Sequence, residues 1–167
     1  SLGHERIGCV LSPDDNLHAS PISKARLAGY QQALQSAGIE FDESLLVSGD
    51  FSLSSGLAAA PYFAQMERRP TAVFCMNDEM AIGLIQGLKA QGLKVPDDIS
   101  VAGFDDIEFA KYCDPALTTI AQPAEEIGRA AMSVLYGLLE GQTDTKMKHT
   151  LPTELVIRES TAPPKKT

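Results

Sequence analysis

The 167 residues are enough to build one hydrophobic core of ordinary size, so we expect one globular unit. Apolar residues make up 44% of the chain, and its longest apolar runs fall far short of the roughly 18 residues that a membrane span needs. The 14 basic and 22 acidic residues give a net charge of −8 with no basic cluster, which excludes this part of the protein from direct contact with nucleic acid.

Apolar runs and helix-like stretches alternate along the first hundred residues. In chain order we predict strand 7–11, helix 23–37, strand 45–51, helix 53–66, strand 71–76, helix 77–91 and strand 99–104. Strands that look buried on both faces and are joined by helices are typical of a parallel sheet. The sequence therefore predicts an α/β fold, a parallel open sheet flanked by helices in a Rossmann-like arrangement. Pro61 lies inside the second helix, where we expect a kink or a late start.

After Pro115 the pattern changes. Residues 117–120 form a brief extended piece, and residues 125–140 are predicted to be a helix with a wide apolar stripe. A last strand-like stretch covers about residues 153–158.

The cysteines and histidines indicate no metal or redox site. Cys9 and Cys75 lie in apolar strand-like runs, Cys113 lies in a loop, and no CxxC motif is present. We therefore expect small buried thiols in a reducing compartment. The three histidines are isolated, without metal-ligand spacing, and the sequence indicates no cofactor.

Ligands of open parallel sheets bind beyond the carboxyl ends of the strands. The carboxyl ends of the predicted strands give Pro13, Asp14, Asp50, Phe51, Asn77, Asp78, Asp105 and Asp106. Arg26, in the first turn of the first helix, is expected at the same rim. Carboxylates accept paired hydroxyl groups and an aromatic face stacks on a ring, so this set suits a sugar or a nucleoside.

Each of these residues also has a simpler structural interpretation. Asn77 and Asp78 are favoured helix caps, and Asp105 or Asp106 suits a turn. Phe51 is equally compatible with the core, and Arg26 with an exposed helix surface. Their convergence on one edge of the sheet is the stronger argument.

We predict that the chain is not an enzyme. No phosphate-binding glycine motif follows a strand, and neither a GxSxG motif nor a Ser-His-Asp set is present. Asp105 and Asp106 resemble a Mg²⁺-binding pair, but adjacent residues of a strand point to opposite faces.

Five motifs together carry a resemblance to a known family. They are Gly3–Gly8 (GHxxIG), Arg26–Tyr30 (RxxGY), Pro70–Ala81 (PTAxxxxND-MA), Pro96–Asp106 (PxDxSxxGFDD) and Leu117–Pro123 (LTTIxQP). Their order and spacing from residue 3 to about 160 resemble the effector-binding region of LacI/GalR-family transcription regulators. Because Ser1 stands where a complete protein has Met, we expect the sequence to be part of a longer chain.

The resemblance implies two lobes of the type I periplasmic-binding-protein-like kind, hinged around an effector. It assigns residues 1–116 and 150–162 to the C-terminal lobe, and residues 117–149 to a crossover strand and a helix of an N-terminal lobe outside this sequence. It also implies a helix-turn-helix headpiece, absent here, that alone contacts operator DNA. The protein would be a cytoplasmic homodimer without membrane contact.

The resemblance also implies site residues. Arg26, Phe51 and Asp105 match effector-contacting positions of the family, Asn77 or Asp78 often does, and Ser20 and Gln122 are further candidates.

The implied effector is a nucleoside or a sugar. The segments 49–51, 112–115 and 120–123 are most similar to cytidine-responsive members, which implies that Asp105 takes ribose hydroxyls and Phe51 borders the base. Ser20 and Ile22 depart from the purine-responsive members, which disfavours a purine. The alternative is a periplasmic sugar- or nucleoside-binding protein of a transporter.

Overall fold

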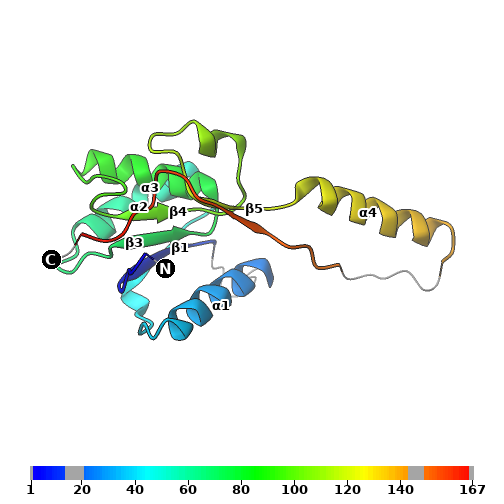
Figure 1. Cartoon of the computed structure of the whole chain (residues 1–167), viewed down its shortest axis with the longest axis horizontal. Helices are drawn as coiled ribbons and strands as arrows, with labels where there is room; N and C mark the ends of the chain where they lie inside the picture. Colours follow the sequence, from blue (N-terminus) through cyan, green and yellow to red (C-terminus); the bar gives the residue numbers. More distant parts are fainter. Residues whose placement is uncertain (1, 14–20, 143–148, 166–167) are drawn as a thin grey trace.

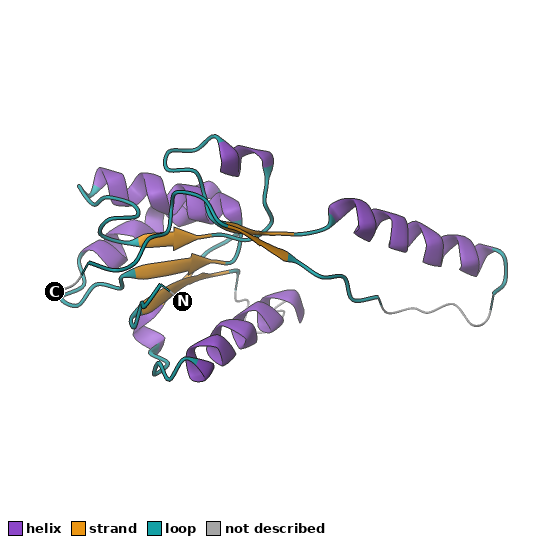
Figure 2. Cartoon of the chain, in the orientation of Figure 1, coloured by secondary structure: helices purple, strands orange, loops and turns teal. Residues whose placement is uncertain are grey.

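The computed structural model describes residues 2–13, 21–142 and 149–165 (Figure 1). A four-stranded parallel sheet in the order β2-β1-β3-β4 forms its centre. Its strands are β1 (Ile7–Leu11), β2 (Leu46–Ser48), β3 (Ala72–Cys75) and β4 (Ser100–Ala102). Helix α1 (Pro21–Ser36) lies on one face, and α2 (Leu53–Ala64) and α3 (Asp78–Ala90) lie on the other (Figure 2). The predicted fold class is confirmed.

Local sequence explains where the helices begin. Pro21, at the first position of α1, has the backbone angle that a helix start requires. The side chain of Ser52 caps α2 by accepting from the Ser55 N–H. The prediction of a late start for α2 is wrong: the helix begins at Leu53, and Pro61 lies in its second half. The missing Pro61 N–H removes only one intrahelical hydrogen bond there.

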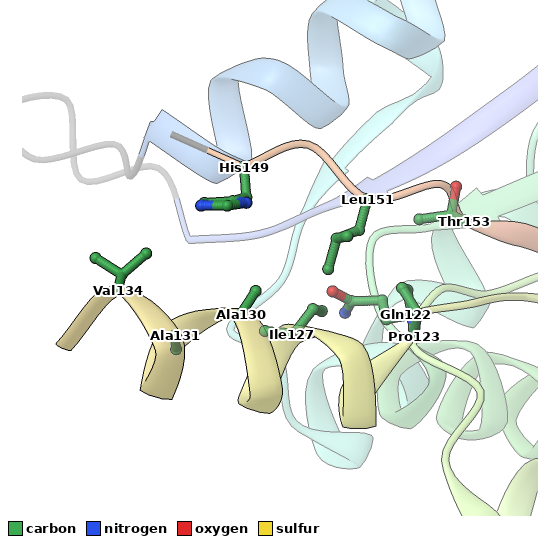
Figure 3. A pocket seen from close by; sticks show the side chains of 9 residues that line it. All are labelled: Gln122, Pro123, Ile127, Ala130, Ala131, Val134, His149, Leu151 and Thr153. Carbon is green, nitrogen blue, oxygen red and sulfur yellow. The ribbon is translucent and has the colours of Figure 1, made fainter. Parts of the chain in front are cut away.

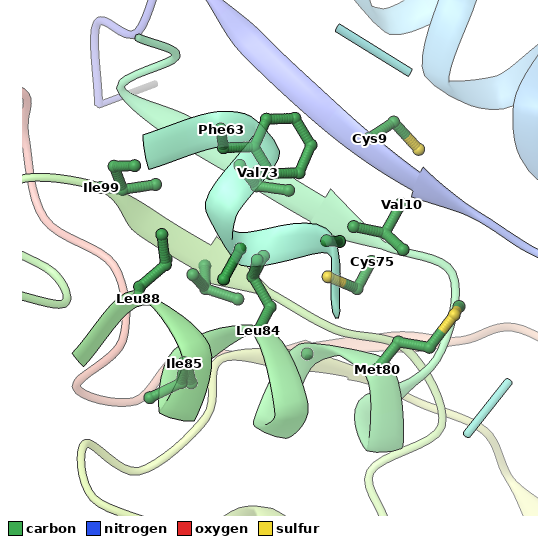
Figure 4. Packing of buried hydrophobic residues seen from close by; sticks show 14 of the residues in the cluster. Cys9, Val10, Phe63, Val73, Cys75, Met80, Leu84, Ile85, Leu88 and Ile99 are labelled. Carbon is green, nitrogen blue, oxygen red and sulfur yellow. The ribbon is translucent and has the colours of Figure 1, made fainter. Parts of the chain in front are cut away.

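The core fills the space between the sheet and helices α2 and α3. Figure 4 shows Phe63 of α2 and Leu84 and Leu88 of α3 packed over Val73 of β3. All four side chains are at most 1% exposed. The two helices can approach closely because Gly56 and Gly83 have no side chain. A Cβ on Gly56 would overlap the Met80 carbonyl, and one on Gly83 would overlap the Leu53 carbonyl.

The predicted burial of the two strand cysteines is confirmed. Cys9 and Cys75 are fully buried, and burial raises the pKa of the Cys9 thiol to about 12. Cys113 is half-buried. All three are free thiols in the structure.

Beyond β4 the chain leaves the sheet. Strand β5 (Thr119–Ala121) follows a parallel bridge between Ala102 and Thr118, and it pairs antiparallel with β6 (Glu154–Val156). Between them lies α4 (Ala124–Leu139), which stands apart from the sheet and its helices (Figure 1). Large apolar side chains of α4 are exposed, Leu139 to 76%. Within the described ranges, no helix combines the length and apolarity that crossing a membrane requires.

Candidate ligand-binding site

The four parallel strands end at one edge of the sheet. Val10 is level with Cys75, and Phe74 is level with Ala102, so the segments after β1, β3 and β4 leave the sheet side by side. Asp105 is held level with Ala121 by a further parallel bridge. This edge is the rim on which the predicted residues were expected to meet.

Arg26, Asp105 and Gln122 form the centre of the rim. Gln122 Nε2 donates to Asp105 Oδ1 at 2.6 Å, and Arg26 Nη2 lies 3.4 Å from the same oxygen. Arg26 Nη1 also donates to the Met76 carbonyl, and the guanidinium carbon lies 4.0 Å from the centre of the Phe104 ring. Two segments, α1 and the residue that follows β5, therefore orient the Asp105 carboxylate, which keeps 30% of its side-chain surface exposed. The interpretation of Arg26 as a plain surface residue is wrong.

Asn77 and Phe51 form a second part of the rim, next to Met76. Asn77 Oδ1 accepts from the Met80 N–H, which confirms the capping interpretation of this residue. Its Nδ2 donates to the Phe51 carbonyl at 2.8 Å. Phe51 is 37% exposed, so it does not belong to the core.

Asp78 differs from the other candidates because it lies beneath the rim. It is fully buried, and its two carboxylate oxygens accept from the Ile107 N–H at 2.9 Å and from the Thr119 hydroxyl at 2.5 Å. A dissolved ligand does not reach this side chain in the structure. The burial favours a structural role for Asp78 over effector contact.

Asp105 and Asp106 have separate partners, although they are adjacent in the sequence. Asp106 Oδ1 accepts from Arg158 Nη2 at 2.5 Å, and these two side chains are only 19% and 13% exposed. Arg158 also donates to the Leu117 carbonyl. The two carboxylates therefore do not converge on one point, as a shared metal ion would require.

The backbone is strained at the rim. Phe51 has a φ of 69°, Asp105 of 123° and Asp106 of 55°. Residues other than glycine rarely adopt positive φ values. Such strain persists only where surrounding contacts enforce it, and it concentrates at functional sites.

Three carboxylates lie close together at this edge, and two of them have a cationic partner. Arg26 offsets the charge of Asp105, and Arg158 that of Asp106. Burial raises the pKa of Asp78, the hydrogen bonds from Thr119 and Ile107 oppose this shift, and the two neighbouring carboxylates add to it. Of these three carboxylates, Asp105 is the most exposed.

Two cavities adjoin the rim. A largely apolar groove of about 950 Å³ separates α1 from the sheet, and Arg26, Phe104 and Gln122 line it. A second cavity lies between α4 and the returning chain, with Gln122 and Pro123 at one end and Val134 and His149 at the other (Figure 3). Gln122 thus lines both cavities, where the chain passes from the sheet to α4.

Ser20 lies outside the described residues. Among the residues that are described, no cluster of three potential metal ligands occurs. Sequence reasoning missed Phe104, Arg158 and Thr119. Phe104 directly precedes Asp105, so its place in the strand end was a usable signal, whereas nothing local connects Arg158 with Asp106.

The fold and the rim define a lobe of the periplasmic-binding-protein type. The family model described as "Periplasmic binding protein-like domain" matches residues 1–161, so the chain belongs to that family. Within it, the chain is the effector-binding region of a LacI-family regulator, which confirms the resemblance seen in the sequence.

Named relatives support this assignment. The chain is 45% identical over 159 residues to the HTH-type transcriptional repressor CytR of Escherichia coli (strain K12), covering 95% of this chain and 46% of that protein. It is 39% identical over 158 residues to the repressor PurR of Photobacterium profundum, with the same two coverages of 95% and 46%. The chain spans about half the length of the curated relatives it matches. Both relatives are named as transcriptional repressors, a non-enzymatic class, as the sequence predicted.

Solved structures agree. The complex of the transcriptional regulator CelR with cellobiose superimposes with a TM-score of 0.86 at 36% identity, over 95% of this chain and 47% of that one. The lac repressor dimer bound to operator and the anti-inducer ONPF gives a TM-score of 0.86 at 33% identity, over 96% of this chain and 54% of that one.

Proposed function

We propose that this chain is the effector-sensing lobe of a cytoplasmic LacI-type transcription repressor, with a nucleoside or a sugar as effector and cytidine as the first candidate. The observation that carries the proposal is the cluster of Arg26 and Gln122 around the accessible carboxylate of Asp105. A carboxylate fixed in this way accepts the paired hydroxyl groups of a ribose or another sugar.

The other rim residues complete the proposed site. The exposed ring of Phe51 offers an apolar face for a nucleobase, and Asn77 fixes the backbone at Phe51. Ser20 remains a candidate from the sequence. We place Asp78 among the supports of the site, because it is fully buried. The similarity to CytR favours a nucleoside, and the similarity to a regulator bound to cellobiose favours a sugar.

We also propose how the chain divides between lobes. Residues 1–116 and 150–162 form the C-terminal lobe, and residues 117–149 cross to an N-terminal lobe that this sequence does not include. The separation of α4 from the sheet and its exposed apolar side chains support this division. A headpiece outside this sequence would contact operator DNA, the protein would act as a homodimer, and the effector would shift the equilibrium between lobe arrangements.

The alternative is a periplasmic binding protein that delivers a sugar or nucleoside to a transporter. The name of the matching family covers such proteins, whereas the curated relatives are repressors. Fractionation of native cells separates the two, since the repressor is expected in the cytoplasm and the transport protein in the periplasm.

Calorimetric titration of the full-length protein with cytidine, cytosine, ribose and cellobiose tests the effector. We expect cytidine to bind at least tenfold more tightly than cytosine, because cytosine lacks the ribose hydroxyl groups that would donate hydrogen bonds to Asp105. Equal affinity for the two contradicts the role of Asp105. Binding of the sugars alone selects the sugar arm, and binding of none of the four compounds contradicts the proposed effector classes.

A further inference from the structure

Asp78 is the first residue of α3 and sits where three segments meet. Its neighbours are α3 itself, the loop 103–107 that carries Asp105, and β5, which leads to α4. Asp78 and Thr119 are both 0% exposed. Burying a carboxylate in such a place costs free energy unless hydrogen bonds satisfy it. The hydrogen bonds that Asp78 accepts are therefore important for this part of the fold.

The two oxygens of Asp78 bond two different segments. Oδ2 accepts from the Ile107 N–H of the loop at 2.9 Å, and Oδ1 accepts from the Thr119 hydroxyl of β5 at 2.5 Å. Gly103 allows this approach, because a Cβ at that position would overlap Asp78 Oδ1. Asp78 therefore clamps the loop to the strand from inside the fold.

The same two segments meet again at the rim. The Asp105 N–H donates to the Ile120 carbonyl at 2.9 Å, and Gln122 Nε2 donates to Asp105 Oδ1 at 2.6 Å. Asp105 is thus separated by one residue from Ile107, which donates to Asp78. Ile120 directly follows Thr119, the other hydrogen-bond partner of Asp78.

We propose that Asp78 is a positioning residue that locks loop 103–107 to β5, so that occupancy of the rim at Asp105 is transmitted to the segment leading to α4. The inference rests on the proposed function, because it supplies the link between effector and lobe movement. Asp78 itself touches no effector.

The experiment uses the full-length protein with three variants. Thr119→Val removes the hydroxyl and keeps the shape of the side chain. Asp78→Asn keeps both bonds if the Thr119 hydroxyl reverses from donor to acceptor, so it is the conservative variant. Ser100→Ala is the matched control, since it removes another buried hydroxyl, bonded to Ala162, at the start of β4 away from the rim.

The first measurement is hydrogen exchange without ligand. We expect the Asp105 amide to exchange at least tenfold faster in Thr119→Val, and to change less than threefold in Asp78→Asn and Ser100→Ala. Unchanged exchange of the Asp105 amide in Thr119→Val overturns the proposal, whichever ligand the protein binds.

The second measurement is the change in operator affinity at saturating cytidine, or at saturating cellobiose if the sugar arm holds. We expect this change to fall at least fivefold in Thr119→Val while effector affinity falls less than threefold; Asp78→Asn and Ser100→Ala stay within twofold of wild type. Wild-type coupling in Thr119→Val, or an equal loss in Ser100→Ala, overturns the transmitting role. Absence of any effector binding by wild type instead contradicts the proposed function, and the exchange experiment still decides the clamp.

Discussion

Replacing Asp105 and Asp106 one at a time by asparagine should separate ligand binding from stability at adjacent positions. Asparagine has the shape of aspartate, but it carries no charge and turns one acceptor oxygen into a donor. Asp105 is the accessible carboxylate of the rim, whereas Asp106 is paired with Arg158 and mostly buried. The substitution of aspartate by asparagine is therefore made once at an exposed carboxylate and once at a largely buried, paired one.

The expected magnitudes follow from those environments. A hydrogen bond to a charged group contributes about 1.5–3 kcal/mol net, against about 1 kcal/mol for a neutral one. Two ribose hydroxyls that lose the charge of Asp105 should each lose ~1 kcal/mol, and the total of ~2 kcal/mol is a roughly 30-fold weaker affinity. Asp106→Asn removes the charge from the 2.5 Å pair with Arg158 and leaves that largely buried guanidinium without a counter-ion, which together cost ~2 kcal/mol of unfolding free energy. For a lobe of this size that unfolds as its own cooperative unit within the full-length protein, that loss lowers Tm by about 4–8 °C.

Calorimetric titration of the full-length variants with cytidine and thermal unfolding of the same samples give both quantities. We expect Asp105→Asn to weaken binding with a Tm within about 3 °C of wild type. We expect Asp106→Asn to lower Tm and to leave the affinity within threefold. A drop in affinity for Asp106→Asn that matches or exceeds the drop for Asp105→Asn would show that the roles have been assigned to the wrong carboxylates.

Two further predictions concern stability. Gly56→Ala should lower the unfolding free energy by ~1–3 kcal/mol, because the new methyl overlaps the Met80 carbonyl, whereas Gly29→Ala in α1 meets nothing within 4 Å and should raise it by ~0.5–1 kcal/mol. Urea unfolding measures both, and a shift of the same sign in the two variants contradicts the packing argument. Burial lowers the pKa of His4 below its usual 6.5, against the opposing hydrogen bond to Ala162, so its contribution to stability is complete above pH 6.5 and declines as the pH falls through the lowered value. His4→Asn should flatten the decline of Tm between about pH 7 and pH 5, and an unaltered slope excludes His4 as its source.

The order of strands and helices was readable from the sequence because each element has a strong local pattern. Strand 7–11 was predicted with the observed bounds, and helix 125–140 differs from α4 by one residue at each end. The late start at Pro61 was wrong for a physical reason. A proline in the second half of a short helix removes one bond, and the packing of α2 on α3 outweighs that loss.

At the site, the sequence predicted part of the rim but not how deeply each residue lies. Arg26, Asp105 and Gln122 were predicted from the strand ends and the family resemblance, and the structure brings them into contact. Asp78 was grouped with Asn77 because both follow the same strand. Only the fold separates them, because the burial of Asp78 depends on Thr119, 41 residues further along the chain. Long-range pairs of this kind leave no local pattern.

The most direct test of the account is the binding of full-length protein to its operator, selected from random DNA, with and without saturating cytidine. Effector coupling in allosteric proteins is typically 5- to 150-fold, so we predict a change of about that size in operator affinity. We further predict that Asp105→Asn requires a roughly 30-fold higher cytidine concentration for the same change. An operator affinity that neither cytidine nor a sugar alters would contradict the assignment of this lobe as an effector sensor.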